Sequence, residues 1–159
     1  MEFRCRLATA GGEMLKVLST ALTSESFKVG SSASIASSAA PVSMWLLKRS
    51  GLAERLTLVD FDWRFNPKLP RSACFELHTL KFIAEGTNAL IIGKPGTGKS
   101  HVAKAVAYQA TLQAYDVSYV EADTEFARYA LASSDEQARL LKGWIAADLL
   151  VLDDLFLAR

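Results

Sequence analysis

Residues 89–100 contain the most informative segment of the chain, Ala89-Leu90-Ile91-Ile92-Gly93-Lys94-Pro95-Gly96-Thr97-Gly98-Lys99-Ser100. Its first four residues form a short apolar run, which is typical of a strand buried on both faces. The glycine-rich part that follows allows a tight turn, and apolar residues then recur at helical spacing from Lys99 to about Ala114. We therefore predict a strand, a loop and a helix in direct succession.

Residues 93–100 fit the pattern G-x-x-x-x-G-K-[ST] at every fixed position, in the context that this pattern requires. The glycines let several backbone N–H groups turn toward one point, where an anion also meets the positive end of the helix. The Lys99 ammonium can reach the β- and γ-phosphates of ATP, and the Ser100 hydroxyl can ligate Mg²⁺. The predicted nucleotide-binding residues are Gly93, Pro95, Gly96, Thr97, Gly98, Lys99, Ser100 and His101. Thr97 occupies a variable position of the pattern, and the His101 side chain is expected on the exposed side of the helix.

A second motif follows later in the chain, where Leu149-Leu150-Val151-Leu152 leads into Asp153-Asp154. A carboxylate at the carboxyl end of a buried parallel strand faces the crevice where open α/β sheets bind their ligands. We expect Asp153 to hold Mg²⁺ beside Ser100, directly or through water. Asp154 is the candidate catalytic residue, which would orient or deprotonate an attacking water molecule. The alternative for both carboxylates is a solvated acidic turn.

Helical and strand patterns alternate around these two motifs. Apolar spacing predicts a helix over 70–86, a strand over 117–121, a helix capped by Asp123 or Thr124, and a helix opened by a capping box at 134–137. In the last of these helices, Ala138, Leu141 and Ile145 are expected on one face. Strands that alternate with helices predict a parallel sheet flanked by helices, so the fold class is α/β.

The first third of the chain differs from the rest. Ten of the thirteen residues from Ser31 to Ser43 are Ser or Ala, and no hydrophobic period survives there. We therefore expect residues 1–56 to be a low-complexity or weakly structured segment, with a short helix between Pro41 and Leu56 that breaks at Ser50-Gly51. Residues 57–159 are expected to form a partial nucleotide-binding domain.

Composition excludes several classes of protein. The chain has 159 residues, of which 50% are hydrophobic and 22% charged, as in soluble globular proteins. Two cysteines are too few for a disulfide framework, and no run of 18 apolar residues could span a membrane. A reduced, cytoplasmic setting is expected.

Charge is divided unevenly along the chain, because residues 1–82 carry 11 Lys and Arg against 7 Asp and Glu. This mild excess favours an anionic partner, but it includes no dense basic stripe that could neutralise many phosphates. Arg64, Lys68 and Arg71 come nearest to a cluster, with solvated positions around a turn as the alternative. We expect binding to DNA to be weak and independent of its sequence.

With both motifs placed, residues 57–159 resemble the IstB-like helper ATPases of insertion sequences, which are close relatives of the DnaC-type helicase loaders. The resemblance is carried by Leu58-Val59-Asp60-Phe61-Asp62, Phe65-Asn66-Pro67, Phe75-Glu76-Leu77, Gly93 to His101, and Leu149 to Arg159. It implies an AAA+ ATPase that assembles on DNA and helps a partner transposase to select a target site. It also implies that Gly93, Gly98, Lys99 and Ser100 hold the nucleotide and Asp153 holds Mg²⁺. Asp154 takes the second acidic position, where many AAA+ proteins have Glu.

Two departures from the family pattern shape the expected function. Residues 1–50 do not resemble the helical region with which the family begins. The chain ends at Arg159, before the family's later strands, sensor residue, arginine finger and lid helices. In AAA+ domains a fourth strand lies between the first and the third, so we expect a gap in the sheet. Because the arginine finger would also lie beyond Arg159, we expect a fragment that binds ATP but hydrolyses it negligibly.

Three alternatives to a transposition helper stay open at this point. The first is a helicase loader for DNA replication, which a transposase gene next to this one would argue against. The second is a non-catalytic remnant of a disrupted gene. The third is a small-molecule kinase, for which the sequence offers no lid and no substrate pocket.

Overall fold

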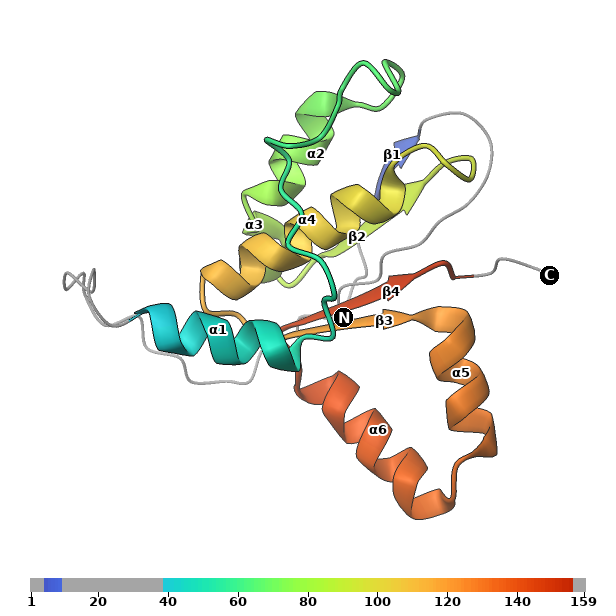
Figure 1. Cartoon of the computed structure of the whole chain (residues 1–159). Helices are drawn as coiled ribbons and strands as arrows, with labels where there is room; N and C mark the ends of the chain where they lie inside the picture. Colours follow the sequence, from blue (N-terminus) through green and yellow to red (C-terminus); the bar gives the residue numbers. More distant parts are fainter. Residues whose placement is uncertain (1–4, 10–38, 156–159) are drawn as a thin grey trace.

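The structure is a computed structural model that describes residues 5–9 and 39–155 (Figure 1). Its elements in chain order are β1 (Cys5–Thr9), α1 (Ala39–Arg49), α2 (Arg71–His78), α3 (Lys81–Ala84), β2 (Asn88–Ile92), α4 (Lys99–Leu112), β3 (Val117–Glu121), α5 (Ala122–Leu131), α6 (Ser134–Ala146) and β4 (Leu149–Asp153). Most of the Ser/Ala-rich stretch and Arg159 lie outside the described residues. Among the helices described, none has both the length and the apolar character that crossing a membrane requires.

The strands form two parallel pairs, β1 with β2 and β3 with β4. The predicted parallel α/β arrangement is therefore confirmed, and its strand and helix follow residues 89–112 nearly as expected. Within the described residues β2 and β4 do not pair, so the sheet is divided between them, as the sequence analysis anticipated. Apolar residues of both strands line one small cavity at this division, namely Ala89, Ile91, Leu149 and Val151.

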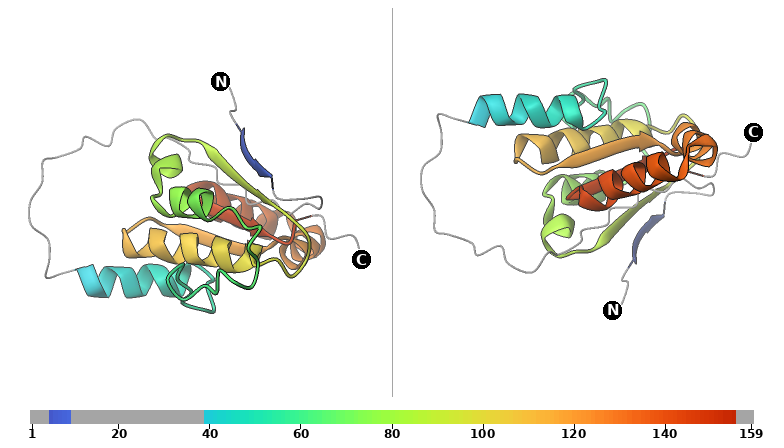
Figure 2. Two further views of the ribbon diagram at one scale, coloured as in Figure 1. Left: turned by 90° about the horizontal axis from the view of Figure 1, so that it is seen from above. Right: turned by 90° about the horizontal axis from the view of Figure 1, so that it is seen from below.

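Helix α4 holds the two halves of the fold together. It contacts β2 on one side of the division and β3 and β4 on the other. Small residues make this close approach possible, since Ala103, Ala107 and Ala110 are all almost completely buried. Helix α1 runs beside α4 in both views of Figure 2 and also contacts β3. The loop at the amino end of α4 is thereby placed beside the carboxyl end of β4.

Helix α1 corresponds to the short helix expected between residues 41 and 56. It begins slightly earlier, at Ala39, and ends at the predicted break, where Gly51 adopts φ +79°. The turn also covers the outer edge of β3, because the backbone N–H of Tyr119 donates to the Ser50 carbonyl at 2.7 Å. An edge strand with an unpaired backbone would invite association with other chains.

The helix predicted over 70–86 is two helices. Leu80 adopts a left-handed conformation with φ +62°, which ends α2 and allows the short α3 to turn away. This conformation is unfavourable for leucine, but the side chain is 2% exposed and lies in the core. Burial of Leu80 offsets the backbone cost, which helical spacing alone does not reveal.

The predicted caps of α5 and α6 were both wrong. Helix α5 begins at Ala122 without a side-chain cap from Asp123 or Thr124. Helix α6 is capped by Ser133, whose hydroxyl accepts the Glu136 N–H, one residue before the predicted capping box. Ala138, Leu141 and Ile145, which were expected on one face of α6, are exposed.

The orientation of α6 follows from its packing against α5. The Trp144 ring lies 5.8 Å from Tyr129 and 6.3 Å from Phe126, both on α5. These aromatic contacts turn Leu140 and Trp144 toward β3 and leave the adjacent face open.

The strand β2 also differs from expectation, because Ala89 is buried but Leu90 and the residues after it are only half-buried. Among the described residues no strand pairs with β2 on the side of β4, so its residues are less covered on that side.

Candidate nucleotide-binding site

Residues 93–100 connect β2 to α4 in a tight loop, here called the phosphate loop. Gly96 and Gly98 adopt φ of +72° and +91°, a region that glycine enters without the steric cost of a Cβ atom. Space also requires glycine at Gly98, where a Cβ would lie 2.7 Å from the Phe61 ring. Pro95 and Gly96 form the exposed tip of the loop, while Gly93 is buried at its base.

The Lys99 side chain folds back over this loop. It is 6% exposed, and its Nζ donates to the Lys94 carbonyl at 2.5 Å. The Thr97 hydroxyl donates to the same carbonyl at 2.8 Å. The ammonium is therefore held within reach of anything bound by the loop, and a phosphate oxygen could replace the carbonyl as its acceptor.

Ser100 and Asp153 meet in the structure although 53 positions separate them in the chain. The Ser100 hydroxyl donates to Asp153 Oδ1 at 3.2 Å, and the carboxylate is 2% exposed. Asp153 is the last residue of β4, and Ser100 lies in the first turn of α4. The contact between α4 and β4 thus brings together the two motifs recognised in the sequence.

Tyr119 is a member of this site that the sequence analysis missed. Its hydroxyl donates to Asp153 Oδ2, so both carboxylate oxygens have protein donors. Burial, and then the hydrogen bond to Asp153, raises the pKa of the Tyr119 hydroxyl well above its usual value. The sequence did contain a signal for this role of Tyr119, because a buried tyrosine near the end of a parallel strand needs a polar partner for its hydroxyl. Choosing that partner requires the pairing of β3 with β4, in which Tyr119 is opposite Val151.

Asp154, the predicted catalytic carboxylate, follows β4 in a left-handed turn with φ +54°. Its backbone N–H donates to Asp153 Oδ1 at 3.0 Å, which fixes the turn at the end of the strand. Burial, and then the charge of Asp153, raises the pKa of the Asp154 carboxyl.

His101 does not lie on the exposed side of α4, contrary to expectation. Its ring is half-buried, with Nε2 3.1 Å from the Thr57 carbonyl, an arrangement in which Nε2–H donates. The ring also packs edge-to-face against Phe61 at 4.9 Å. His101 therefore connects the phosphate loop to the segment that precedes α2, and its predicted contact with nucleotide stays a prediction.

The donor set fits Mg²⁺ bound together with phosphate. Ser100 Oγ and Asp153 Oδ1 are hard oxygen ligands that lie side by side, and Mg²⁺ commonly takes one carboxylate while phosphates and water supply the remaining ligands. Among the described residues, no cluster of three or more His, Cys, Asp or Glu side chains could hold a metal alone. A metal here would therefore depend on the nucleotide for some of its ligands.

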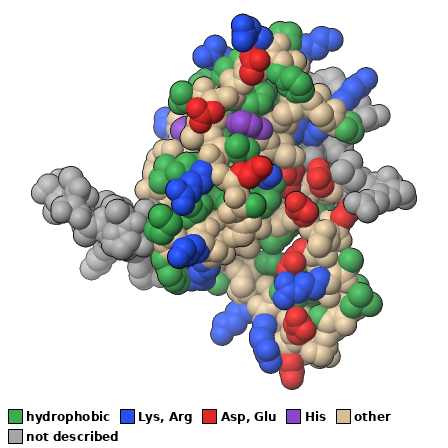
Figure 3. Space-filling view, viewed as in Figure 1, with side chains coloured by type: hydrophobic (Ala, Val, Ile, Leu, Met, Phe, Trp, Pro, Cys, Tyr) green, Lys and Arg blue, Asp and Glu red, His purple; other side chains and the backbone are tan. Residues whose placement is uncertain are grey.

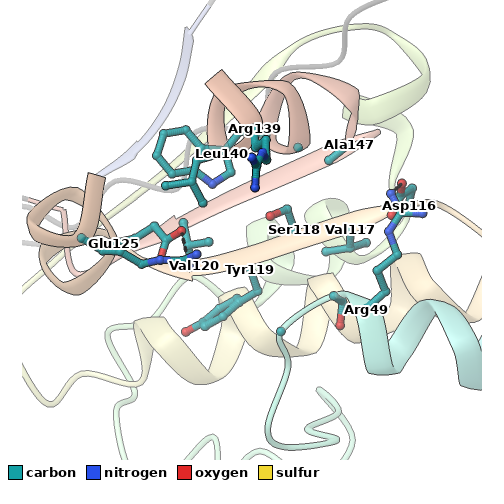
Figure 4. A pocket seen from close by; sticks show the side chains of 15 residues that line it. Arg49, Asp116, Val117, Ser118, Tyr119, Val120, Glu125, Arg139, Leu140 and Ala147 are labelled. Carbon is teal, nitrogen blue, oxygen red and sulfur yellow. Dashed lines mark hydrogen bonds and ion pairs between the residues drawn. The ribbon is translucent and has the colours of Figure 1, made fainter. Parts of the chain in front are cut away.

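A separate pocket of about 360 Å³ lies between β3, the end of α1 and the α5–α6 pair. Arg139 and Leu140 project over it from α6, while the Tyr119 side chain points away from them toward the other face of β3 (Figure 4). Two of its arginines are paired with acids, since Arg49 contacts Asp116 at 2.8 Å and Arg128 contacts Glu125 at 3.5 Å. None of the phosphate-loop residues lines this pocket.

A parallel α/β fold with a phosphate loop beside a strand-end aspartate defines the class of phosphate-loop nucleotide-binding proteins. The profile of one family, the IstB-like ATP binding proteins, matches residues 39–158. The chain belongs to this family. The match includes α1, so the expectation that the resemblance begins at residue 57 and excludes residues 1–50 was wrong for residues 39–50.

Three bacterial proteins are similar to this chain. A protein of Geobacillus stearothermophilus, named for ATP binding in insertion sequence IS5376, is 29% identical over 113 residues, or 69% of this chain and 44% of the relative. A Pseudomonas aeruginosa protein, named for ATP binding in insertion sequence IS21, is 31% identical over 110 residues, or 69% and 42%. An insertion-sequence protein of Mycobacterium tuberculosis, also named for ATP binding, is 28% identical over 109 residues, or 68% and 43%. The chain thus spans less than half the length of these relatives.

Proposed function

We propose that this chain acts as an ATP-binding helper of insertion-sequence transposition, in the cytoplasm. The observation that carries the proposal is the 3.2 Å contact between Ser100 of the phosphate loop and Asp153 at the end of β4. This contact joins the phosphate-binding backbone to a carboxylate, as nucleotide binding with Mg²⁺ requires. The relatives described above are named for insertion sequences, which favours transposition over replication or a small-molecule kinase.

Each residue of the site has a distinct task in this proposal. The backbone N–H groups of residues 93–98 and the Lys99 ammonium hold the phosphates, and Ser100 with Asp153 holds Mg²⁺. When bound, Mg²⁺ would supply positive charge that offsets the charge of the phosphates. Tyr119 keeps the Asp153 carboxylate in place by bonding its second oxygen. Asp154 would accept a proton from a water molecule near the phosphates.

A nucleotide titration tests this proposal. The wild-type chain should bind a fluorescent ATP analogue with Mg²⁺, and Lys99→Ala should weaken binding at least about tenfold because a charge-assisted contact to phosphate is lost. Lys94→Ala is the matched control, since it removes an exposed lysine of the same loop. Asp153→Asn should reduce only the part of the affinity that depends on Mg²⁺. Equal affinities for wild type and Lys99→Ala would refute the proposal.

We also propose DNA and a transposase as partners, with self-assembly on DNA and only weak DNA contacts from this chain. Basic side chains are scattered among apolar and acidic ones on the face in Figure 3. Arg64 forms an ion pair with Asp62 at 3.3 Å, and the Arg71 guanidinium lies 5.1 Å from the Trp63 ring centroid. These arginines are partly engaged within the protein, which leaves few charges for phosphate contacts.

Fluorescence anisotropy with labelled duplexes of unrelated sequence tests this second part. Binding should be similar for all duplexes and should be lost as salt approaches physiological concentration. Tight retention of one duplex sequence at physiological salt would contradict it.

A further inference from the structure

Residues 57–67, here called the strap loop, contact the phosphate loop and the start of α4 at three points. The Thr57 carbonyl accepts from His101, the Phe61 ring lies against Gly98, and the Asn66 side chain bonds to Thr97. These contacts join segments more than 30 positions apart in the sequence. The loop of a predicted phosphate site is therefore held from outside by a segment with no assigned role in nucleotide binding.

The contact from Asn66 is specific in geometry. Its Nδ2 donates to the Thr97 carbonyl at 3.1 Å, while its Oδ1 accepts the Lys68 N–H at 3.2 Å. In a trans peptide the carbonyl and the following N–H point in opposite directions. With the Thr97 carbonyl held toward Asn66, the Gly98 N–H points away from the Asn66 side chain. A phosphate bound on that side of the loop would accept a hydrogen bond from this N–H.

Phe61 secures the next position of the loop. The ring lies so close to Gly98 that a Cβ there would be 2.7 Å from its Cζ, and it is 7% exposed. It also packs edge-to-face on His101 at 4.9 Å. Asn66 and Phe61 thus restrain consecutive residues, Thr97 and Gly98, where the peptide could otherwise rotate.

The strap loop is itself anchored, which allows it to restrain another loop. Trp63 stacks on Phe75 of α2 at 5.5 Å and meets Phe61 at 4.8 Å, so one row of rings links α2 to the phosphate loop. Leu58 is 1% exposed and belongs to the core. A loop anchored at Leu58 and Trp63 presents Asn66 at a defined distance from Thr97.

We infer that Asn66 is a positioning residue for nucleotide binding, which holds the Thr97–Gly98 peptide in the orientation that directs the Gly98 N–H toward a bound phosphate. This inference rests on the proposed function of the site. It assigns to the strap loop a share of the nucleotide affinity, although its residues need not touch the nucleotide. Phe61 supports the same orientation through the Gly98 backbone.

Two substitutions of Asn66 separate this role from a structural one. Asn66→Asp keeps the acceptor for the Lys68 N–H but places an oxygen where Nδ2 donated, so the bond to Thr97 is lost. Asn66→Ser is uncharged, retains the ability to cap the local turn, and is too short to reach Thr97. Phe65→Asp is the matched charge control, since Phe65 is an exposed neighbour and the Asn66 bond stays intact.

Two measurements are made on each variant: titration with a fluorescent ATP analogue and Mg²⁺, and hydrogen–deuterium exchange of peptides covering residues 93–99 without nucleotide. Both Asn66 variants should bind nucleotide about five- to tenfold more weakly, the loss that one hydrogen bond accounts for, while they still unfold in a single cooperative urea transition. Their phosphate-loop amides should exchange faster, and Phe65→Asp should resemble wild type in both measurements.

The outcomes distinguish this inference from the proposed function. If wild type binds nucleotide and Lys99→Ala does not, but both Asn66 variants bind like wild type, the positioning role is wrong and the proposed function stands. If wild type binds no nucleotide, the proposed function fails, and unchanged exchange at residues 93–99 in the Asn66 variants would then refute the positioning role as well. A lower urea midpoint in both variants with unchanged exchange would show a structural role only.

Discussion

Three donors surround the Asp153 carboxylate, and each comes from a different part of the chain. Ser100 and the Asp154 N–H bond Oδ1, and Tyr119 bonds Oδ2. A buried carboxylate needs such partners because leaving one of its oxygens unpaired costs free energy. The orientation of the carboxylate is thus set before any metal or nucleotide binds.

Tyr119→Phe should lower the free energy of unfolding by about 1–3 kcal/mol, because it removes the donor to Oδ2 and little volume. Urea denaturation of both proteins measures the change. Tyr115→Phe is the control, since Tyr115 also packs against the core without a bond to Asp153. A loss of similar size in both variants would show that the hydroxyl of Tyr119 is not what matters.

Cys74 is expected to be unreactive in the folded chain. It is 4% exposed, and burial raises the pKa of its thiol from 9.0 to about 11. The thiolate population near pH 8 is then about 100-fold lower than for an ordinary thiol, and access adds a further restriction. In a Cys5→Ser background, reaction with Ellman's reagent should be fast in urea and slow in buffer. A fast reaction in buffer would contradict this environment.

The same shift predicts how stability depends on pH. The unfolded thiol releases its proton near pH 9, whereas the folded thiol retains it until about pH 11. The folded state therefore binds more protons in this window, so the free energy of unfolding contributed by Cys74 falls as pH rises from 9 to 11. Urea denaturation of Cys74→Ala should show less of this decline than wild type.

At the scale of elements, helix ends are set by individual side chains. The Ser133 hydroxyl accepts the Glu136 N–H and caps α6, while Ser134 is already helical. Ser133→Ala should lower the free energy of unfolding by about 1 kcal/mol, and Ser134→Ala should have little effect. Urea midpoints of the two variants provide the comparison. The reverse order would support the capping box predicted from the sequence.

Gly51, in the turn after α1, and Gly143, in α6, should respond in opposite directions to substitution by alanine. A Cβ at Gly51 would lie 2.7 Å from the Tyr119 carbonyl, and the residue has φ +79°, whereas Gly143 in α6 has nothing within 4 Å. Gly51→Ala should therefore destabilise the fold and loosen the turn that covers the edge of β3. Gly143→Ala should raise the free energy of unfolding by about 0.5–1 kcal/mol, as alanine does in a helix interior. Thermal unfolding of both variants tests the contrast.

At the scale of the whole molecule, the nucleotide site joins two separately paired halves. The phosphate loop follows β2 and Asp153 ends β4, and these strands do not pair with each other in the described residues. Helix α4 connects both halves, so a ligand held by Lys99 and Asp153 would add a second connection. Binding should therefore stabilise the fold as a unit.

A thermal shift experiment tests this connection. At a ligand concentration 100 times the Kd, ATP with Mg²⁺ should stabilise the chain by about 2.7 kcal/mol and raise the midpoint by several degrees. Lys99→Ala should remove most of the shift, and chelation of Mg²⁺ should reduce it. A shift that persists in Lys99→Ala would place the ligand elsewhere.

Much of the fold was predictable because its signals are local. The phosphate loop, the strands at 117–121 and 149–153, and the helix after Lys99 each follow from spacing within a few residues. The juxtaposition of Ser100 and Asp153 could be anticipated because carboxyl ends of parallel strands meet at one edge of a sheet. The class of the protein and the centre of its candidate site could therefore be predicted from local patterns of residues.

The other features of the fold and of the site depend on packing between segments that are distant in the sequence. Leu80 breaks a helix because burial offsets its backbone cost, and α6 turns its apolar residues outward because Trp144 packs on α5. Tyr119 and Asn66 reach Asp153 and Thr97 only after distant segments have come together. Such contacts depend on the sum of many weak interactions across the core, which no pattern of neighbouring residues contains, and so the tertiary structure alone could reveal them.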